Sequence, residues 1–132
     1  MACLLLPVAG CGDSSDLNLV PVHGTVTCAG KAVPGLFITF LPEKGRPSWA
    51  LSDESGNYQA TYTTDKKGVQ AGMCRVWVTF KPQNEEQATA IMNGQDPFAQ
   101  WAELLKKYGN EVTTPLQIRV SPKQARLDLQ LD

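Results

Sequence analysis

Cysteine and histidine are the side chains best suited to metal binding and nucleophilic chemistry, and this chain of 132 residues has few of them. Its four cysteines, Cys3, Cys11, Cys28 and Cys74, form no C-x-x-C pair, and His23 is the single histidine. Structural zinc takes a closely spaced set of such ligands, so a zinc site has poor support. An enzyme needs a base beside its nucleophile or metal, and His23 alone could be one member of a site at most. We therefore expect His23 to be a solvated strand residue, the protein not to be an enzyme, and no metal or cofactor to be bound.

Carboxylate and amide side chains around position 53 are a second candidate for chemistry. Asp53, Glu54, Asn57 and Asp65 carry the oxygen atoms that calcium prefers. Their spacing does not match the helix–loop–helix calcium motif. Asp53 and Asn57 are also typical of a tight turn, with Gly56 at the left-handed position. We expect a turn here and not a calcium site.

The tryptophans Trp49, Trp77 and Trp101 are the third candidate. Aromatic side chains exposed on a sheet can stack on sugars or anchor a protein partner. They could instead be covered, because residues 97–108 read as a helix with an apolar stripe, and laying this stripe over Trp77 would bury both. The sequence favours this packing over an open ligand patch formed by the three tryptophans.

The first residues combine an apolar run with a cysteine. Residues 1–10 are apolar and small, and Val8-Ala9-Gly10-Cys11 resembles the lipobox of bacterial lipoproteins. In such signals the peptide is cut before the cysteine, which is then acylated and anchors the domain to a membrane. A positively charged segment before the run is missing, so two interpretations stay open, a start upstream of Met1 or an apolar tail. On either one we expect residues 1–19 to stay outside the fold, as a lipoprotein signal remnant and flexible tether.

Composition limits the remaining possibilities. The length fits one domain, residues 20–132, and a hydrophobic share of 42% is enough for a core. The formal net charge is −1 without a block of like charge, so a nucleic-acid partner lacks its basic surface. No apolar run is long enough to cross a bilayer. The expected contacts are with a membrane, through the lipid on Cys11, and with an envelope protein or glycan.

Alternation of apolar and polar residues predicts the elements that position these side chains. Seven segments read as strands: residues 22–28, 36–41, 48–52, 58–63, 73–80, 116–120 and 127–131. Short strands separated by turn residues predict an all-β fold, a seven-stranded antiparallel β-sandwich. Cys28 and Cys74 then both point inward. They either form a disulfide in an oxidising compartment or pack as separate small core residues.

One segment breaks the strand pattern. Residues 81–111 read as an insertion that is polar and unpatterned as far as Gln95. Asp96 is a good N-cap, Pro97 suits the first helical position, and Gly109 ends the helix. We therefore predict one short helix over residues 97–108, before the last two strands.

Turn glycines and core positions then carry a family resemblance. They are Gly24-x-Val26, Gly30-Lys31-x-Val33-Pro34-Gly35, Ile38-x-Phe40, Ser52-Asp53-x-x-Gly56-x-Tyr58 and Ala71-Gly72-x-x-x-Val76-x-Val78. This pattern resembles the carboxypeptidase regulatory-like domain, and the stretch from Lys107-Tyr108 to Leu131 is similar to the ending of small planctomycete-type lipoproteins. The resemblance covers residues 20–132 apart from the insertion. It implies a transthyretin-like Greek-key sandwich without catalytic activity, with a role in folding support, anchoring or interaction.

These observations predict a non-catalytic cell-envelope lipoprotein module with a structural or protein-interaction role. It would be lipid-anchored to a membrane and face the periplasm or the exterior. The alternative is a carbohydrate- or peptide-binding module that uses Trp49, Trp77 and Trp101.

Overall fold

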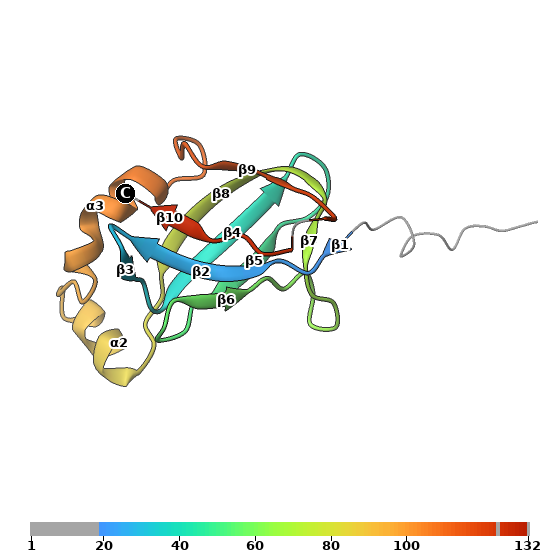
Figure 1. Ribbon diagram of the computed structural model, residues 1–132. Helices are drawn as coiled ribbons and strands as arrows, with labels where there is room; N and C mark the ends of the chain where they lie inside the picture. The colour runs from blue at the N-terminus through green and yellow to red at the C-terminus, as the bar shows by residue number, and fades with distance from the viewer. Residues whose placement is uncertain (1–18, 124, 132) are drawn as a thin grey trace, which may run out of the picture.

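The computed structural model describes residues 19–123 and 125–131, and this part of the chain is mostly β-structure (Figure 1). The strands are β1 (Leu19–Val20), β2 (His23–Cys28), β3 (Lys31–Ala32), β4 (Leu36–Pro42), β5 (Ser48–Leu51), β6 (Asn57–Gln59), β7 (Val69–Gln70), β8 (Gly72–Phe80), β9 (Gln117–Val120) and β10 (Leu129–Leu131). The helices are α2 (Glu85–Met92) and α3 (Ala102–Tyr108), and a 3-10 turn, η1 (Ala99–Trp101), leads into α3. Each of the seven predicted strand segments overlaps an observed strand. The described residues form ten strands and not seven, because β1, β3 and β7 are additional strands of two residues each.

Most of these strands belong to two four-stranded sheets. One has the order β5-β4-β8-β9 with antiparallel neighbours throughout. The other is centred on β2, which pairs with β10 along one edge and with β6 and β3 in turn along the other. β1 and β7 form a separate small antiparallel pair.

The last strand departs from the antiparallel prediction. β10 runs parallel to β2, with Leu129 opposite Val26 and Leu131 opposite Cys28. A parallel neighbour requires a long connection, and here almost the whole chain lies between the two strands. Local alternation indicates which residues of β10 face inward, but it does not indicate the strand beside which β10 lies.

The two sheets lie over one another with a shared hydrophobic core between them (Figure 1). Leu36, Ile38 and Phe40 alternate along β4 and have no exposed surface, and Val76 and Val78 of β8 lie beside them. The sheet around β2 contributes the buried side chains Val26, Tyr58, Leu129 and Leu131. The period of two in the sequence is therefore the period of burial, as expected for strands with one face on a core.

The insertion contains two helices where one was predicted. α2 was missed because residues 85–92 have no apolar stripe, and no residue of this helix is buried. Its signal is local instead: the Asn84 side chain accepts from the Gln87 amide at 2.9 Å, and Gln87 Oε1 accepts from the Gln83 amide at 2.7 Å. This reciprocal pattern is close to a capping box.

The predicted helix over residues 97–108 exists in part. Asp96 accepts from the Phe98 amide at 2.9 Å, as a capping residue should, but residues 99–101 form a 3-10 turn before α3 begins. A 3-10 turn has fewer residues per turn than an α-helix, so it rotates the side chains that follow. As a result Leu104, outside the predicted stripe, is buried together with Tyr108, and Ala102 is exposed.

The insertion covers one end of the core and not the face that carries Trp77. Leu104 and Tyr108 join the core cluster, and α3 lies beside the ends of β2 and β10 (Figure 1). The rings of Phe98 and Trp101 stack on Phe80, with centroids 4.8 Å and 6.2 Å apart. The predicted packing of the helix over Trp77 is therefore wrong, because Phe80 at the end of β8 receives the stripe. Within the described residues no helix is long and apolar enough to cross a membrane.

Candidate functional site

The β5-β4-β8-β9 sheet has a second face that points away from the core, called here the outer face. Directly opposed residues of a sheet point to the same side, so the registers of the four strands define its members. They are Trp49 and Leu51 of β5, Phe37, Thr39 and Leu41 of β4, Met73, Arg75, Trp77 and Thr79 of β8, and Gln117 and Arg119 of β9.

Two of the three candidate tryptophans meet on this face. Thr39 lies opposite Trp49 on one side and opposite Trp77 on the other, so the backbones of the two tryptophans are two strand spacings apart, about 10 Å. The ring of Phe37 stacks on Trp49 with centroids 5.8 Å apart and an interplanar angle of 12°. Trp49 is 44% exposed and the neighbouring Leu51 is 43% exposed. The result is an apolar aromatic surface open to solvent.

Cationic side chains border this aromatic surface. Lys81 Nζ lies 4.1 Å from the centroid of the Phe37 ring, a cation–π contact. Arg75 and Arg119 are exposed on the same face beyond Trp77. Aromatic residues and arginine are the side chains that most often carry the binding energy of protein interfaces. The outer face therefore has the composition of a docking surface.

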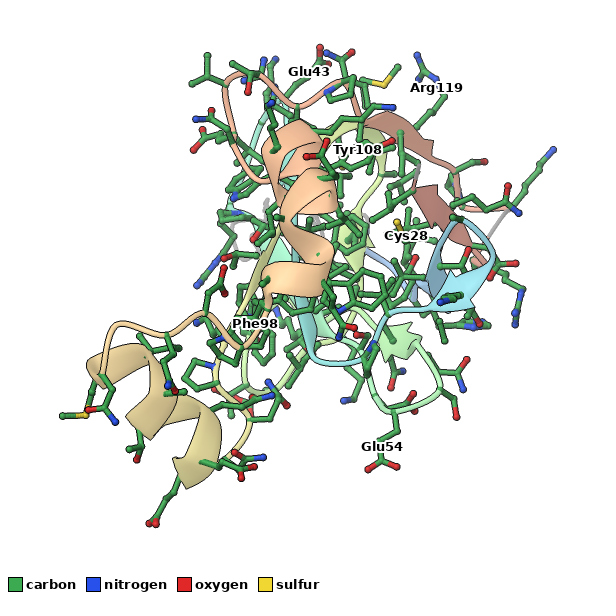
Figure 2. The ribbon with its side chains drawn as sticks, turned by 90° about the vertical axis from the view of Figure 1, so that its left-hand side faces the viewer. Cys28, Glu43, Glu54, Phe98, Tyr108 and Arg119 are labelled. Carbon is green, nitrogen blue, oxygen red and sulfur yellow. The ribbon has the colours of Figure 1, made fainter. Side chains whose placement is uncertain are left out.

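Trp101 lies elsewhere, so the predicted patch of three tryptophans is divided. It belongs to η1 and stacks on Phe80, the ring on which Phe98 also stacks. Figure 2 faces this end of the molecule and labels Phe98. Together with polar side chains these three rings line a crevice between the insertion and the sheets. Sequence reasoning found Trp49, Trp77 and Trp101 but could not group them, because the grouping depends on the register of β4 with its neighbours.

Cys28 and Cys74 are both free thiols. Cys74 lies opposite Pro42, at the far end of β4 from Leu36, whereas Cys28 precedes the turn into β3, whose chain continues to Leu36. The length of β4 separates these ends by about 20 Å, far beyond the reach of a disulfide. Cys74 is buried, and loss of hydration raises the pKa of its thiol to about 11. Of the two alternatives, the structure has the separate core residues.

The remaining candidates have structural surroundings. The His23 side chain is exposed, and its backbone pairs with the last segment of the chain through Ala125 and Leu127. Asp53 Oδ1 accepts from the amides of Ser55 and Asn57, both at 2.9 Å, which confirms the predicted turn. Across the described ranges, no three histidine, cysteine, aspartate or glutamate residues are close enough to hold a metal ion.

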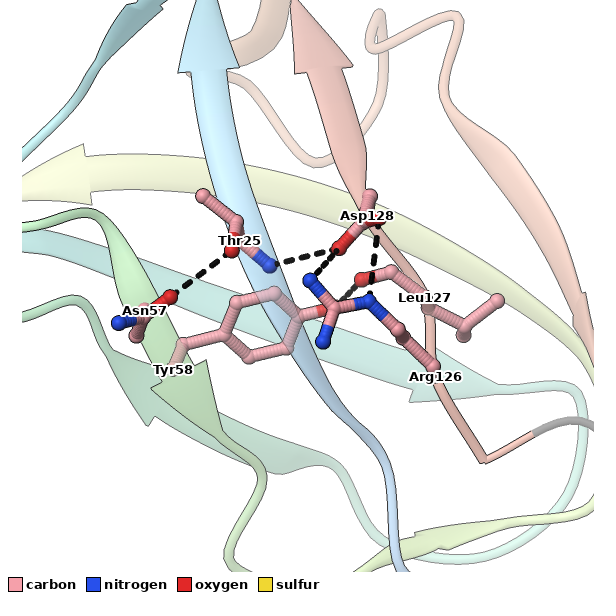
Figure 3. A network of polar contacts seen from close by, with 6 residues as sticks. All are labelled: Thr25, Asn57, Tyr58, Arg126, Leu127 and Asp128. Carbon is pink, nitrogen blue, oxygen red and sulfur yellow. Dashed lines mark hydrogen bonds and ion pairs between the residues drawn. The ribbon is translucent and has the colours of Figure 1, made fainter.

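A polar network on the opposite sheet fastens the last strand (Figure 3). Asp128 accepts from the Thr25 amide at 2.9 Å and from Arg126 Nε at 3.3 Å, and Thr25 Oγ1 donates to Asn57 Oδ1 at 2.8 Å. The Thr25 amide, and after it Arg126, holds the pKa of the Asp128 carboxyl below its usual value. The network joins β6, β2 and the approach to β10, and its role is structural.

The buried tyrosine of this network lies underneath its exposed polar groups. Tyr58 on β6 donates its hydroxyl to the Leu127 carbonyl (Figure 3). Burial, and after it the charge of Asp128, raises the pKa of Tyr58 well above its usual value. The phenol therefore stays protonated and keeps donating this hydrogen bond.

Comparison with family models, with curated proteins and with solved structures finds no match to this chain. The predicted lipid attachment at Cys11 and residues 1–18 of the predicted tether lie outside the described residues. Its last residue, Leu19, pairs with Gln70 in the β1–β7 ladder, so the expectation that residues 1–19 stay outside the fold is wrong at this residue.

Proposed function

We propose that this protein is a non-catalytic module of a bacterial cell envelope that holds a protein partner on its outer face. One observation carries this proposal: Trp49, Phe37 and Trp77 form an aromatic surface on a regular sheet, and Trp49 and Leu51 are more than two-fifths exposed. Monomeric proteins rarely leave contiguous large apolar side chains uncovered unless a partner binds them.

The rigidity of this surface also favours a docking role. Its side chains stand on the central strands β4 and β8 and on the neighbouring edge strand β5, and the opposite face of all three strands is packed into the core. A partner therefore loses little entropy in ordering the surface. The bordering arginines, Arg75 and Arg119, would pair with acidic groups at the rim of the partner.

The proposal includes the family and fold type that the sequence resembles. We assign the two sheets to a transthyretin-like Greek-key sandwich of the carboxypeptidase regulatory type. In support, the turn glycines of the shared pattern stand where only glycine is comfortable: Gly30, Gly35 and Gly56 have φ values of 84°, 69° and 82°.

The envelope address rests on Val8-Ala9-Gly10-Cys11 and on the polar stretch that follows it. Acylation at Cys11 would leave a short tether before β1, with the domain close to the membrane surface. A partner on the outer face would then be another envelope protein.

Site-specific photo-crosslinking in the membrane fraction tests the docking proposal. A photoreactive phenylalanine replaces Thr79, which is exposed on the outer face, and in a matched control Gln130, which is exposed on β10 of the other sheet. We expect a discrete protein adduct from position 79 alone, which disappears when Trp49→Ala and Trp77→Ala are added. Equal adducts from both positions, or none from position 79, would refute the docking role.

The intact mass of the native protein tests the address. We expect a mature protein that begins at Cys11 and carries acyl groups in the membrane fraction, and an unprocessed one for Cys11→Ser. An unacylated wild-type protein in the soluble fraction would remove the envelope from the proposal and leave the docking surface to be judged by the crosslinking result.

A further inference from the structure

The insertion, the end of β8 and two nearby turns line a crevice that the outer-face proposal does not use. It has a volume of about 530 Å³, within the range of small-molecule sites. Phe98 and Trp101 of the insertion form one wall, Phe80 lies at the end of β8, and the turn with Asp53 and Glu54 forms the other wall. Figure 2 faces this end of the molecule, with Phe98 on the insertion and Glu54 on the turn.

The aromatic side of the crevice is a stacked set of three rings. Phe80 and Phe98 are 4.8 Å apart with an interplanar angle of 11°, and Trp101 lies 6.2 Å from Phe80 at 24°. Each of the three side chains is half-buried, so part of each ring is open to the crevice. The stack holds Trp101 in one orientation without burying it, as a stacking platform for a ligand requires.

The polar side of the crevice is rich in amides, and none of the described residues brings a cation to it. Its lining includes four side-chain amides, Gln83, Asn84, Gln87 and Gln100, and two carboxylates, Asp53 and Glu54, but no lysine or arginine. An amide both donates and accepts hydrogen bonds, which suits hydroxyl groups because these also do both. Two carboxylates without a cation disfavour an anionic ligand.

Part of this polar side is held in place before any ligand arrives. Asn84 accepts from the Gln87 amide and Asp53 from two turn amides, so their orientations are set. The side chains of Gln100 and Glu54 have no hydrogen-bond partner within residues 19–123 and 125–131, which leaves them available to a ligand. The crevice thus combines an aromatic platform, fixed acceptors and two uncommitted polar groups.

We propose that this crevice is a binding site for a neutral saccharide. The apolar C–H face of a sugar ring would lie on Trp101, and its hydroxyl groups would bind Gln100 and Glu54 from the two sides. The site depends on the insertion, since residues 83–101 supply most of its lining. None of the outer-face residues lines the crevice, so the two proposals are independent.

Titration of the isotope-labelled protein with a panel of neutral oligosaccharides, cellotriose, maltotriose and chitobiose, tests the proposal by NMR. We expect at least one of them to shift the Trp101 indole N–H and the signals of Gln100 and Glu54, with those of Trp49 and Trp77 unmoved. Gln100→Ala removes an exposed side chain from the surface and should leave the fold intact. We expect it, and Trp101→Ala, to weaken binding about tenfold, whereas Trp49→Ala leaves the affinity unchanged.

Three results would overturn the saccharide site. They are no shift with any sugar of the panel, shifts that centre on Trp49 and Trp77, or an affinity that Gln100→Ala and Trp101→Ala both leave unaltered. A lysine-rich peptide titrated in parallel tests the ligand class, because binding of this peptide in place of the sugars would assign the crevice to cations. The crosslinking experiment at position 79 probes the outer face and not the crevice. A negative result in one experiment therefore does not affect the other proposal.

Discussion

Tyr58 shows how one hydroxyl group connects strands that are distant in sequence. Its side chain is buried on β6, and its hydroxyl reaches the Leu127 carbonyl on the approach to β10 (Figure 3). Tyr58→Phe keeps the packing of the ring and removes only this hydrogen bond. We expect a loss of about 1 kcal/mol in the free energy of unfolding, measured by urea denaturation.

Tyr62→Phe is the matched control for this substitution. Tyr62 is also buried, and Arg46 lies 5.5 Å from its ring centroid, but its hydroxyl has no hydrogen-bond partner in the part of the chain described. Removal of the Tyr62 hydroxyl should therefore leave the free energy of unfolding unchanged. Equal losses for Tyr58→Phe and Tyr62→Phe would mean that the bond to Leu127 contributes nothing measurable.

Asp128 makes part of the stability depend on acid pH. Its pKa is lowered in the folded protein, chiefly by the Thr25 amide and also by Arg126, so the folded state favours the charged form. This contribution is complete above the pKa of an unfolded aspartate, about 4, and is lost as the pH falls through the lower folded value. We expect Asp128→Asn to be less stable than wild type at pH 7 and the two unfolding curves to converge toward pH 2.

An exposed carboxylate outside the network provides the control substitution. Asp65 has no hydrogen-bond partner among the residues described, so Asp65→Asn should be as stable as the wild type at pH 7. A constant gap between Asp128→Asn and wild type from pH 7 to pH 2 would show that the charge of Asp128 is not the cause.

At the scale of elements, the turn before β6 depends on a glycine that no other residue replaces easily. Gly56 has φ of 82°, and a Cβ atom there would lie 2.7 Å from the Val26 carbonyl oxygen. Gly30 has nearly the same φ, 84°, but no atom of the described residues lies within 4 Å of its Cβ position. The two sites thus separate the cost of the backbone conformation from the cost of a steric clash.

We expect Gly30→Ala to cost about 1 kcal/mol, the penalty of the left-handed conformation, and Gly56→Ala to cost clearly more. Thermal or urea denaturation of both variants measures the difference. Equal costs would mean that β2 and the turn can separate freely, contrary to the close approach of Gly56 to Val26.

The strands could be predicted from the sequence because their signal is local. Val22, Gly24 and Val26 alternate with exposed or half-exposed residues in the structure as they do in the sequence. The partner of each strand is not a local property, so the parallel pairing of β10 and the grouping of Trp49 with Trp77 could not be predicted. α2 is a different case, since Asn84 and Gln87 carried a capping signal that the polarity of the segment obscured.

The helix of the insertion was placed wrongly for a physical reason. Its apolar stripe required cover, and Trp77 was the exposed aromatic residue expected to provide it. The structure uses Phe80, the last residue of β8, together with the open end of the core that receives Leu104. The sequence therefore predicted that burial occurs but not the surface on which it occurs.

On the scale of the whole molecule, the reaction rate of the Cys74 thiol measures how often the core opens. It is 1% exposed, with its thiol pKa raised to about 11, whereas Cys28 is partly exposed. Alkylation followed by peptide mass spectrometry should modify Cys28 readily. In the native protein we expect Cys74 to react at least about 1,000-fold more slowly than in the protein unfolded by urea. The reason is that exposing a central strand requires much of the free energy of unfolding.

The comparison between the two cysteines is internal to one sample, so reagent and pH are matched. Addition of urea below the unfolding midpoint should accelerate the reaction of Cys74 more than that of Cys28. Similar rates for both thiols in native conditions would show that β8 opens locally at its Cys74 end.

The parallel pairing of β2 with β10 has a mechanical consequence. A load that pulls the N-terminal end of β2 away from the C-terminal end of β10 draws the two strands past each other along their axes. All the hydrogen bonds between the two strands, including those of His23 with Ala125 and Leu127 and that of Ala29 with Leu131, then bear the force together.

A load between Lys31 and Leu131 acts differently. Both residues are paired with Cys28, so this load would break the hydrogen bonds one after another. Force spectroscopy should therefore find a higher rupture force between the ends of the domain than between Lys31 and Leu131. A domain that is held to a surface near its first strand and pulled at its last strand would be loaded in the direction in which its unfolding needs the higher force.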